Sequence, residues 1–177
     1  AILTIARAIP DDMIVVIKEH PAQFFWQRYP EFYRIMSKQK NVVFANRDLN
    51  THELIEKAFA VATITGTVAW EGVFAQKPVL LFGQIFCEGI RGINHCASCE
   101  DVIVAIRLIE EKKIEFATSD NIRDFLLRLK QATYIGITDE GYFRTSSLTK
   151  ESSIATISQI LEEQVAFAQP SGENCGS

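Results

Sequence analysis

The chain has 177 residues, of which 47% are hydrophobic and 23% are charged, the balance of a globular protein with one sizeable core. Its 22 acidic and 18 basic residues give a formal net charge of −4, which argues against a general nucleic-acid-binding protein and leaves room for a local phosphate pocket. No run approaches the roughly 20 apolar residues that a membrane-spanning helix requires. The N-terminus lacks the basic and apolar regions of a signal peptide, so we expect none.

The chain starts inside an apolar, helix-like pattern and has no initiator Met. We therefore expect a preceding partner domain that this chain lacks. The first predicted element is the end of a helix over residues 2–8, which Pro10 stops. Residues 13–17 follow as a continuous apolar run, as expected for a strand that is buried on both faces.

Short β-branched runs then alternate with helical patterns, as in a parallel sheet covered by helices. In chain order we predict a helix over 31–40, a strand over 42–45, a helix over 52–59, a strand over 60–64, a helix over 68–75 and a strand over 79–82. Thr51 is expected to cap the second of these helices. The predicted fold class is therefore α/β, a Rossmann-like parallel sheet with helices on both faces.

Residues 84–96 are interpreted as a loop that contains two glycines, and Ser98 is expected to cap the helix that follows. Three more helices are predicted, over residues 99–112, 119–133 and 150–167. We expect a single domain over residues 1–169 and a frayed polar tail over residues 170–177.

Each strong strand ends in a polar loop, and open parallel sheets bind ligands at these carboxyl-end loops. Thr65-Gly66-Thr67 places two hydroxyls and a glycine between a strand and a helix. Hydroxyls and unpaired backbone N–H groups can bind a phosphate there, and Gly66 allows its close approach. Plain capping of the helix by either threonine accounts for the same residues.

Glu71 lies one helical turn beyond Thr67, where a carboxylate can accept hydrogen bonds from the two hydroxyls of a ribose. The alternative is a glutamate that only faces solvent. The neighbours of Glu71 make this helix apolar nearly all round, which favours a carboxylate that has a binding partner.

His20 follows the first strand and precedes Pro21, which restrains its backbone to extended geometry. Its imidazole can meet a phosphate or a base carbonyl, although a single histidine is more often structural. Four weaker candidates lie in carboxyl-end or glycine-containing loops, namely Lys18, Arg47, Gln84 and Arg91.

His95, Cys96 and Cys99 offer soft ligands at a spacing that would suit zinc. A structural zinc site usually needs a second pair of ligands, and the sequence has none nearby. We therefore interpret the cysteines as small, half-buried residues of a protein in a reducing cytoplasm.

Three segments together resemble the C-terminal half of GT-B glycosyltransferases, and most closely the capsule polysaccharide biosynthesis family, which includes Kdo transferases of capsule export. These segments are Ile17-Lys18-Glu19-His20-Pro21, Ile64-Thr65-Gly66-Thr67-Val68-Ala69-Trp70-Glu71-Gly72 and Gln76-Lys77-Pro78-Val79-Leu80-Leu81-Phe82-Gly83. The resemblance spans roughly residues 2–109.

The resemblance implies a role for each matched residue. In related CMP-sugar transferases the histidine of a His-Pro pair contacts the nucleotide, which would fall on His20. A hydroxyl-rich pair at a helix start binds its phosphate, which would fall on Thr65 and Thr67. The glutamate of the following helix holds the ribose, which would fall on Glu71. His20 would also stabilise the leaving phosphate, and the scheme needs no metal and no cofactor besides the nucleotide-sugar substrate.

The resemblance further implies that the acceptor, a glycan or glycolipid, and the catalytic base belong to an N-terminal domain. We therefore expect this chain alone to bind nucleotide weakly and to transfer little or no sugar. We expect a location in the bacterial cytoplasm, where peripheral association with the inner face of the cytoplasmic membrane is possible. We expect no nucleic-acid partner. The CMP-linked donor is one choice among nucleotide-sugars.

Two other functions compete with this one. A UDP-sugar 2-epimerase-like domain shares the fold and a similar phosphate helix, but needs further acids in its cleft. A non-catalytic, flavodoxin-like binding module would have the same loops merely as well-capped turns. Titration with CMP, UDP and GDP distinguishes these alternatives.

Overall fold

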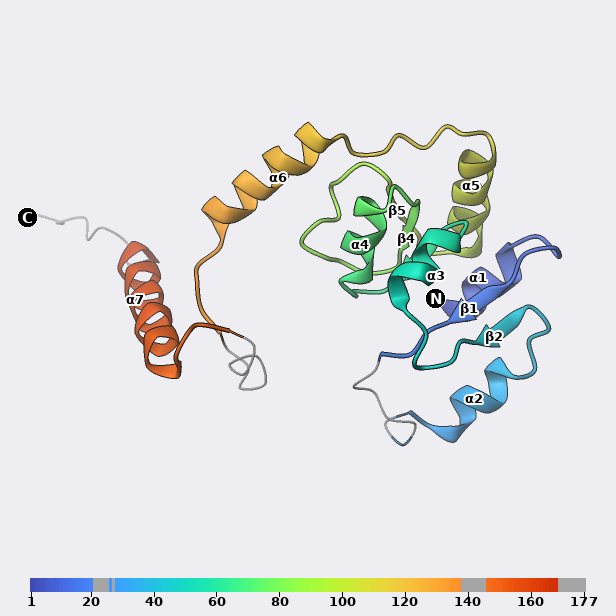
Figure 1. Cartoon of the computed structure of the whole chain (residues 1–177), viewed down its shortest axis with the longest axis horizontal. Helices are drawn as coiled ribbons and strands as arrows, with labels where there is room; N and C mark the ends of the chain where they lie inside the picture. Colours follow the sequence, from blue (N-terminus) through green and yellow to red (C-terminus); the bar gives the residue numbers. More distant parts are fainter. Residues whose placement is uncertain (21–25, 27, 138–145, 169–177) are drawn as a thin grey trace, which may run out of the picture. The chain divides into compact units, whose positions relative to one another are not determined.

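The structure is a computed structural model that describes residues 1–20, 26, 28–137 and 146–168 (Figure 1). Its contacts divide the chain into two compact units, Ala1–Arg123 and Asp124–Ser177. Pro21 and the predicted tail over residues 170–177 lie outside the described residues.

Strands and helices alternate through the first unit, as the sequence predicts. In chain order they are α1 (Ile2–Ala8), β1 (Val15–Ile17), α2 (Pro30–Met36), β2 (Val42–Phe44), α3 (Thr51–Lys57), β3 (Val61–Thr63), α4 (Val68–Phe74), β4 (Val79–Leu81), β5 (Ile93–His95) and α5 (Cys99–Glu110). Among the described residues all strand pairs are parallel, and the strands form two small sheets, β1-β2 and β3-β4-β5. The predicted Rossmann-like α/β class is confirmed, with two small sheets in place of one.

The sheet β3-β4-β5 has helices on both faces. Leu80 of β4 packs in a core cluster with residues of α1 and α5, whereas its neighbour Val79 faces α4 at Gly72. Successive strand residues point to opposite faces, so both faces of β4 are covered, and all three of its residues are buried. This strand is therefore the fully buried one that a continuous apolar run predicts.

The sheet β1-β2 differs, because only one of its faces is buried. Ile17 and Val42 pack with Met36 of α2 and Ala6 of α1, whereas Val16 stays 45% exposed. The prediction that residues 13–17 are buried on both faces is wrong. The short helices α1 and α2 pack on one side of these strands, and the alternate side chains face away from that core.

Helix α1 joins the two cores. Its Ile5 belongs to the cluster formed with β4 and α5, and the adjacent Ala6 belongs to the cluster formed with β1, α2 and β2. Val15 at the start of β1 and Ala60 just before β3 pack against the first of these clusters. Helix α1 and Val15 of β1 therefore connect the two cores.

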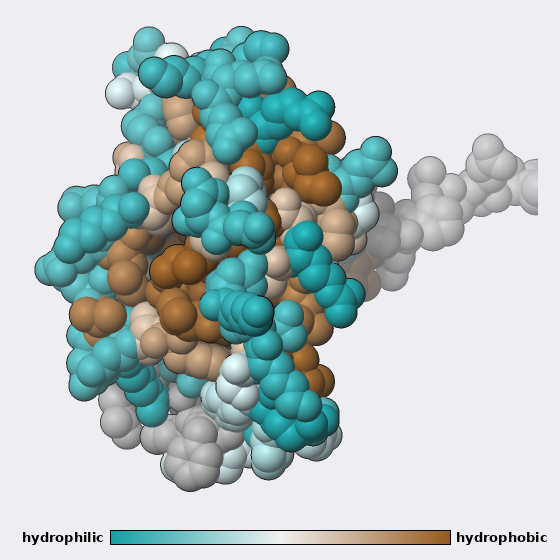
Figure 2. Space-filling model, turned by 90° about the vertical axis from the view of Figure 1, so that its right-hand side faces the viewer, coloured by the Kyte–Doolittle hydropathy of each residue, from teal (hydrophilic) through white to brown (hydrophobic). Residues whose placement is uncertain are grey.

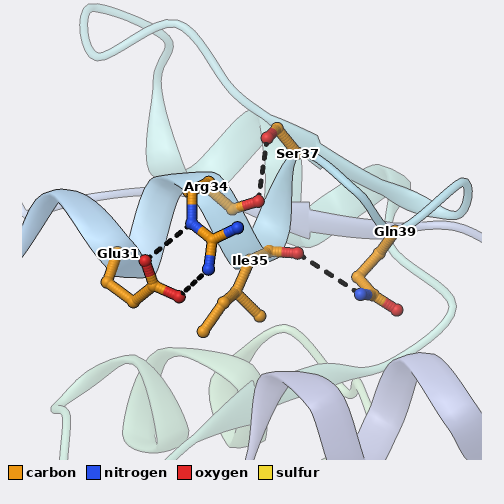
Figure 3. A network of polar contacts seen from close by, with 5 residues as sticks. All are labelled: Glu31, Arg34, Ile35, Ser37 and Gln39. Carbon is orange, nitrogen blue, oxygen red and sulfur yellow. Dashed lines mark hydrogen bonds and ion pairs between the residues drawn. The ribbon is translucent and has the colours of Figure 1, made fainter.

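Helix α2 is shorter than predicted, and its C-terminal side chains account for this. The Ser37 hydroxyl donates to the Arg34 carbonyl at 3.2 Å, and the Gln39 carboxamide donates to the Ile35 carbonyl at 3.3 Å (Figure 3). These bonds satisfy carbonyls that a continued helix would otherwise use. The bidentate pair of Arg34 with Glu31 lies on the exposed side of the same helix, where an ion pair contributes little.

Two helix caps show how the loops are fixed. Ser98 caps α5 as predicted, and Asp101 completes a capping box with it. The cap of α3 is Asn50, whose side chain accepts from the His52 N–H at 2.9 Å, so the prediction of Thr51 is wrong by one residue. Asparagine is among the best capping residues, and it precedes Thr51 in the chain.

Strand β5 lies inside the segment that was predicted as a loop. Ile93 and His95 pair with Val79 and Leu81 of β4. The Asn94 carboxamide also donates to the Val79 carbonyl at 3.4 Å. The strand forms because the edge of β4 is available for pairing. The sequence of β5 is polar, so its pattern alone does not indicate a strand.

The second unit contains most of α6 (Ser119–Ala132) and α7 (Lys150–Ala168), and both predicted helices are confirmed. Within this unit, Ser153 is 2% exposed and its hydroxyl accepts from the Ile137 N–H at 3.4 Å. None of the described side chains of α6 is buried.

The molecular surface on the side of α5 and α2 carries a central group of hydrophobic residues within a hydrophilic rim (Figure 2). Ile103 and Val104 are the exposed large hydrophobics of α5. Among the described helices, none has the length and apolar character needed to cross a bilayer.

A substitution at Gly72 tests the close packing of α4 on its sheet. A Cβ atom at this position would lie 2.9 Å from Cγ2 of Val79, which is fully buried and cannot move aside. We expect Gly72→Ala to lower the free energy of unfolding by about 1 kcal/mol in urea titration, because an overpacking cost with a central value of about 2 kcal/mol exceeds the gain in helix propensity of about 1 kcal/mol.

Gly89→Ala is the matched control, since a Cβ atom there would meet nothing within 4 Å. Its stability should stay close to that of the unchanged protein. A Gly72→Ala protein as stable as this control would contradict the described packing of α4.

Candidate functional site

The loop after β1 is tied to the loop after β2 by one lysine. The Lys18 ammonium donates to the Arg47 carbonyl at 2.7 Å and to the Glu19 carbonyl at 3.3 Å. These two loops follow paired parallel strands, so they leave the same edge of the sheet. Two of the weaker sequence candidates, Lys18 and Arg47, are therefore brought together, with Lys18 in a linking position.

Glu19 is the centre of a polar cluster that the sequence analysis missed. Its carboxylate accepts from Nε of Arg28 at 3.1 Å and from the Tyr33 hydroxyl at 2.9 Å. The Arg28 guanidinium also lies 4.6 Å from the centroid of the Phe32 ring, within range of a cation–π contact. The cluster connects the loop that carries His20 to α2.

The cluster perturbs the tyrosine. Partial burial raises the pKa of Tyr33, and the hydrogen bond to the Glu19 carboxylate and its negative charge raise it further. The positive charges of Arg28 and Arg47 oppose that shift. Arg47 is therefore close enough to act electrostatically on Tyr33, which places a second cation beside the Glu19 cluster.

The segment Thr65-Gly66-Thr67 connects β3 to α4. Thr67 is the N-cap residue of α4, but its side chain makes no capping hydrogen bond. Capping by its hydroxyl, the alternative explanation of this threonine, is therefore not observed. Within the described part of the chain, neither threonine hydroxyl hydrogen-bonds a protein group.

The backbone donors of this segment are fewer than the sequence suggests. The Gly66 N–H donates to the Thr63 hydroxyl at 3.0 Å, and the Ala69 N–H donates to the Gly66 carbonyl at 3.1 Å. Between them, the N–H groups of Thr67 and Val68 have no partner among the described residues. With the Thr65 N–H, which has no partner among the described residues either, three N–H groups and two hydroxyls are left as donors.

Glu71 is half-buried on α4, one turn beyond Thr67. In the part of the chain that the structure describes, its carboxylate forms no ion pair and no side-chain hydrogen bond. The neighbouring Trp70 ring packs edge-on against Phe74, with ring centroids 4.6 Å apart, and at a tilt against Phe86, with centroids 5.9 Å apart. The partner that the apolar surroundings of Glu71 predict is therefore not one of these described protein groups.

The loop after β4 lies directly beside the Thr65 segment. A Cβ atom on Gly83 would lie 2.7 Å from the Ile64 carbonyl oxygen and 3.2 Å from Cγ2 of Thr65. Only glycine fits that approach. Gln84 follows, exposed to solvent, and lines a hollow of about 370 Å³.

Two candidates have no described hydrogen bond to the Thr65-Gly66-Thr67 segment. Arg91 precedes β5, at the amino end of the strand, and pairs with Glu115 at 3.0 Å. His20 is exposed and is not without interaction partners. No described hydrogen bond joins it to Thr65, Thr67 or Glu71. Pro21 lies outside the described residues.

The cysteines beside His95 do not converge on a common point. The Cys96 thiol lies 3.7 Å from the Asn94 carbonyl, whereas the Cys99 thiol lies 3.5 Å from the Thr4 carbonyl. Burial, with a smaller effect of the Asp101 charge, raises the pKa of Cys96 to about 11. Zinc binds the thiolate form, so this shift disfavours Cys96 as a zinc ligand at neutral pH. Within the described residues no group of three His, Cys, Asp or Glu side chains could hold a metal ion.

Parallel strands, carboxyl-end loops with unused donors and a carboxylate one turn along a helix define an α/β protein of the Rossmann-like class. Comparison with protein families matches residues 2–102, more than half of the chain, to the family described as capsule polysaccharide biosynthesis protein. The chain belongs to this family and has a role in capsule polysaccharide synthesis. No curated protein and no solved structure matches it.

Glu19→Gln tests the cluster. The glutamine keeps an acceptor for the Tyr33 hydroxyl but removes the negative charge, so the pKa of Tyr33 should fall towards its ordinary value. Tyrosinate absorbance followed against pH, with the curve of Tyr33→Phe subtracted, measures this. A Tyr33 titration that Glu19→Gln leaves unchanged would show that the carboxylate does not act on the hydroxyl.

Proposed function

We propose that the first unit binds the nucleotide part of a nucleotide-linked sugar, as the donor half of a glycosyltransferase that builds a bacterial capsule. The nucleotide lies along the carboxyl ends of the parallel strands. Transfer itself requires an acceptor-binding domain that supplies the acceptor and the catalytic base, so the chain alone binds nucleotide and transfers little or no sugar.

The observation that carries the proposal is the distribution of the polar candidates along the chain and the fold. His20, Arg47, Thr65 and Thr67 all follow the carboxyl ends of parallel strands. All of them also lie within residues 2–102, the segment that matches the capsule family. Ligands of open parallel sheets bind at such an edge, which favours a binding role over a purely structural one.

The phosphate is assigned to the loop between β3 and α4. The hydroxyls of Thr65 and Thr67 and the N–H groups of Thr67 and Val68 have no partner within the described chain, so they can donate to phosphate oxygens. Charge-assisted hydrogen bonds of this kind are stronger than neutral ones. Glu71, with a carboxylate that no described group pairs, accepts the two ribose hydroxyls.

The loops after β1 and β2 supply positive charge. His20 binds the nucleotide and stabilises the phosphate as it leaves, when its negative charge grows. Lys18 holds the β1 and β2 loops together through the Arg47 carbonyl, and the Glu19 cluster fixes the loop that carries His20. Glu19 is thus a positioning residue.

The resemblance to capsular Kdo transferases favours CMP as the nucleotide. CMP, UDP and GDP titrated by calorimetry should show binding of at least one of them at millimolar concentration, with CMP the tightest. Replacing His20 by Ala should weaken that binding about tenfold or more, since a hydrogen bond to a charged group contributes about 1.5–3 kcal/mol and 1.4 kcal/mol is a factor of ten.

His52→Ala is the matched control, because His52 is an exposed histidine of α3 that is not among the proposed binding residues. Glu71→Gln should weaken nucleotide binding, whereas Glu56→Gln, an exposed glutamate of α3, should not. Binding of no nucleotide at millimolar concentration would contradict the proposal.

A further inference from the structure

A hollow of about 370 Å³ lies at the carboxyl ends of β4 and β5. It is lined by the loop after β4, by the end of β5 and by the start of α5, with Phe82, Gly83, Gln84, His95, Cys96 and Asp101 among its residues. Small-molecule sites are typically a few hundred Å³ in volume, so the hollow suits a single sugar ring better than a whole nucleotide-sugar.

The floor and the rim of the hollow differ in chemistry. Leu81 and Cys96 are buried and form an apolar floor, and the Cys96 thiol stays protonated because burial raises its pKa. Gln84 and His95 are exposed and form a polar rim. A carboxamide both donates and accepts hydrogen bonds, and so does a neutral imidazole.

Asp101 adds a carboxylate to this rim. Its Oδ2 atom accepts from the N–H groups of Ala97 and Ser98 at 2.9 and 2.8 Å and from the Ser98 hydroxyl at 2.9 Å. These bonds lower the pKa of Asp101, so the group is ionised at neutral pH. All of them end on Oδ2, and Oδ1 has no hydrogen-bond partner in the described chain.

The hollow adjoins the segment to which the phosphate is assigned. Gly83 lines the hollow and also abuts Thr65, with its Cβ position 3.2 Å from the Thr65 methyl group. Neighbouring strands lie about 4.8 Å apart, so the ends of β3 and β5, with β4 between them, are about 10 Å apart. A sugar linked to a phosphate at the end of β3 therefore reaches the ends of β4 and β5.

We propose that this hollow binds the hydroxyl-bearing face of the donor's sugar, with Gln84, His95 and Oδ1 of Asp101 as the groups that bind it. The inference rests on the proposed function, because the nucleotide must lie at the neighbouring loop. Vicinal hydroxyls can donate to the carboxylate and exchange hydrogen bonds with the carboxamide and the imidazole. The apolar floor packs against the C–H face of the ring.

The charge of the rim sets the orientation of the sugar. An ionised Asp101 repels a carboxylate, so a sugar that carries one presents its hydroxyls to the hollow and turns its carboxylate away. The site thus selects for hydroxyl groups at this end of the donor.

Calorimetry of matched ligand pairs tests the assignment. Three bare nucleotides, CMP, UDP and GDP, are compared with CMP-N-acetylneuraminate, UDP-glucose and GDP-mannose. For at least one pair the sugar-linked form should bind more tightly. The double variant Gln84→Ala/His95→Ala should weaken the binding of the sugar-linked form about tenfold. Its affinity for the bare nucleotide should stay within about twofold of that of the unchanged protein.

His52→Ala is the control for an exposed histidine elsewhere, and it should change neither member of a pair. Three results would overturn the inference: no gain from the sugar in any pair, a gain that survives the double variant, or an equal loss for bare and sugar-linked forms. In each of these the proposed function stands, because nucleotide still binds. Binding of no nucleotide would overturn both proposals together.

Discussion

The arrangement of the first unit depends on the packing of helix α1 between two cores. Ile5 and Ala6 are adjacent, yet they belong to different clusters, one formed with β4 and α5 and the other with β1, α2 and β2. A seven-residue helix is too short to be stable by itself, so it persists through this packing. Since the two sheets share no described strand pair, α1 links one sheet to the other, together with Val15 of β1, which packs against both clusters.

The polar groups follow from that framework. Parallel pairing sends the loops after β1 and β2 to one edge, and those after β3, β4 and β5 to one edge of the second sheet. In the first set, the Glu19 cluster and Lys18 use protein contacts to hold the loops in place. In the second set, donors and a carboxylate are left without described protein partners. The first set is thus held by contacts within the protein, and the second leaves the groups to which we assign the phosphate and the ribose.

The sequence predicts those parts of the fold that depend on local pattern. The apolar run of β4, the Ser98 cap and the existence of each helix were all predictable, because periodicity and capping are encoded within a few residues. The exposed face of β1 was not predictable, because it depends on which helices pack on the strand. Strand β5 was missed because its pairing with β4 is decided by a distant partner.

The same distinction holds for the candidate site. The sequence places His20, Thr65, Thr67 and Glu71 at strand ends and helix starts, and these positions are observed. It does not reveal that Glu19 binds Arg28 and Tyr33, which lie 9 and 14 residues away, or that Asp101 reaches the hollow beside Gln84. Contacts of this kind form only when loops meet in three dimensions. The one available signal for Glu19 was its place between two other candidates, Lys18 and His20.

The central claim is that the phosphate of a nucleotide lies at the loop between β3 and α4. Backbone amide signals in ¹H–¹⁵N correlation spectra, recorded as CMP is added, test it at the atoms concerned. The account predicts that the Thr67 and Val68 amide signals shift most, because these N–H groups donate to the phosphate, while the Ile103 and Val104 signals on α5 stay in place. Saturable CMP binding that leaves the Thr67 and Val68 signals unmoved would contradict it.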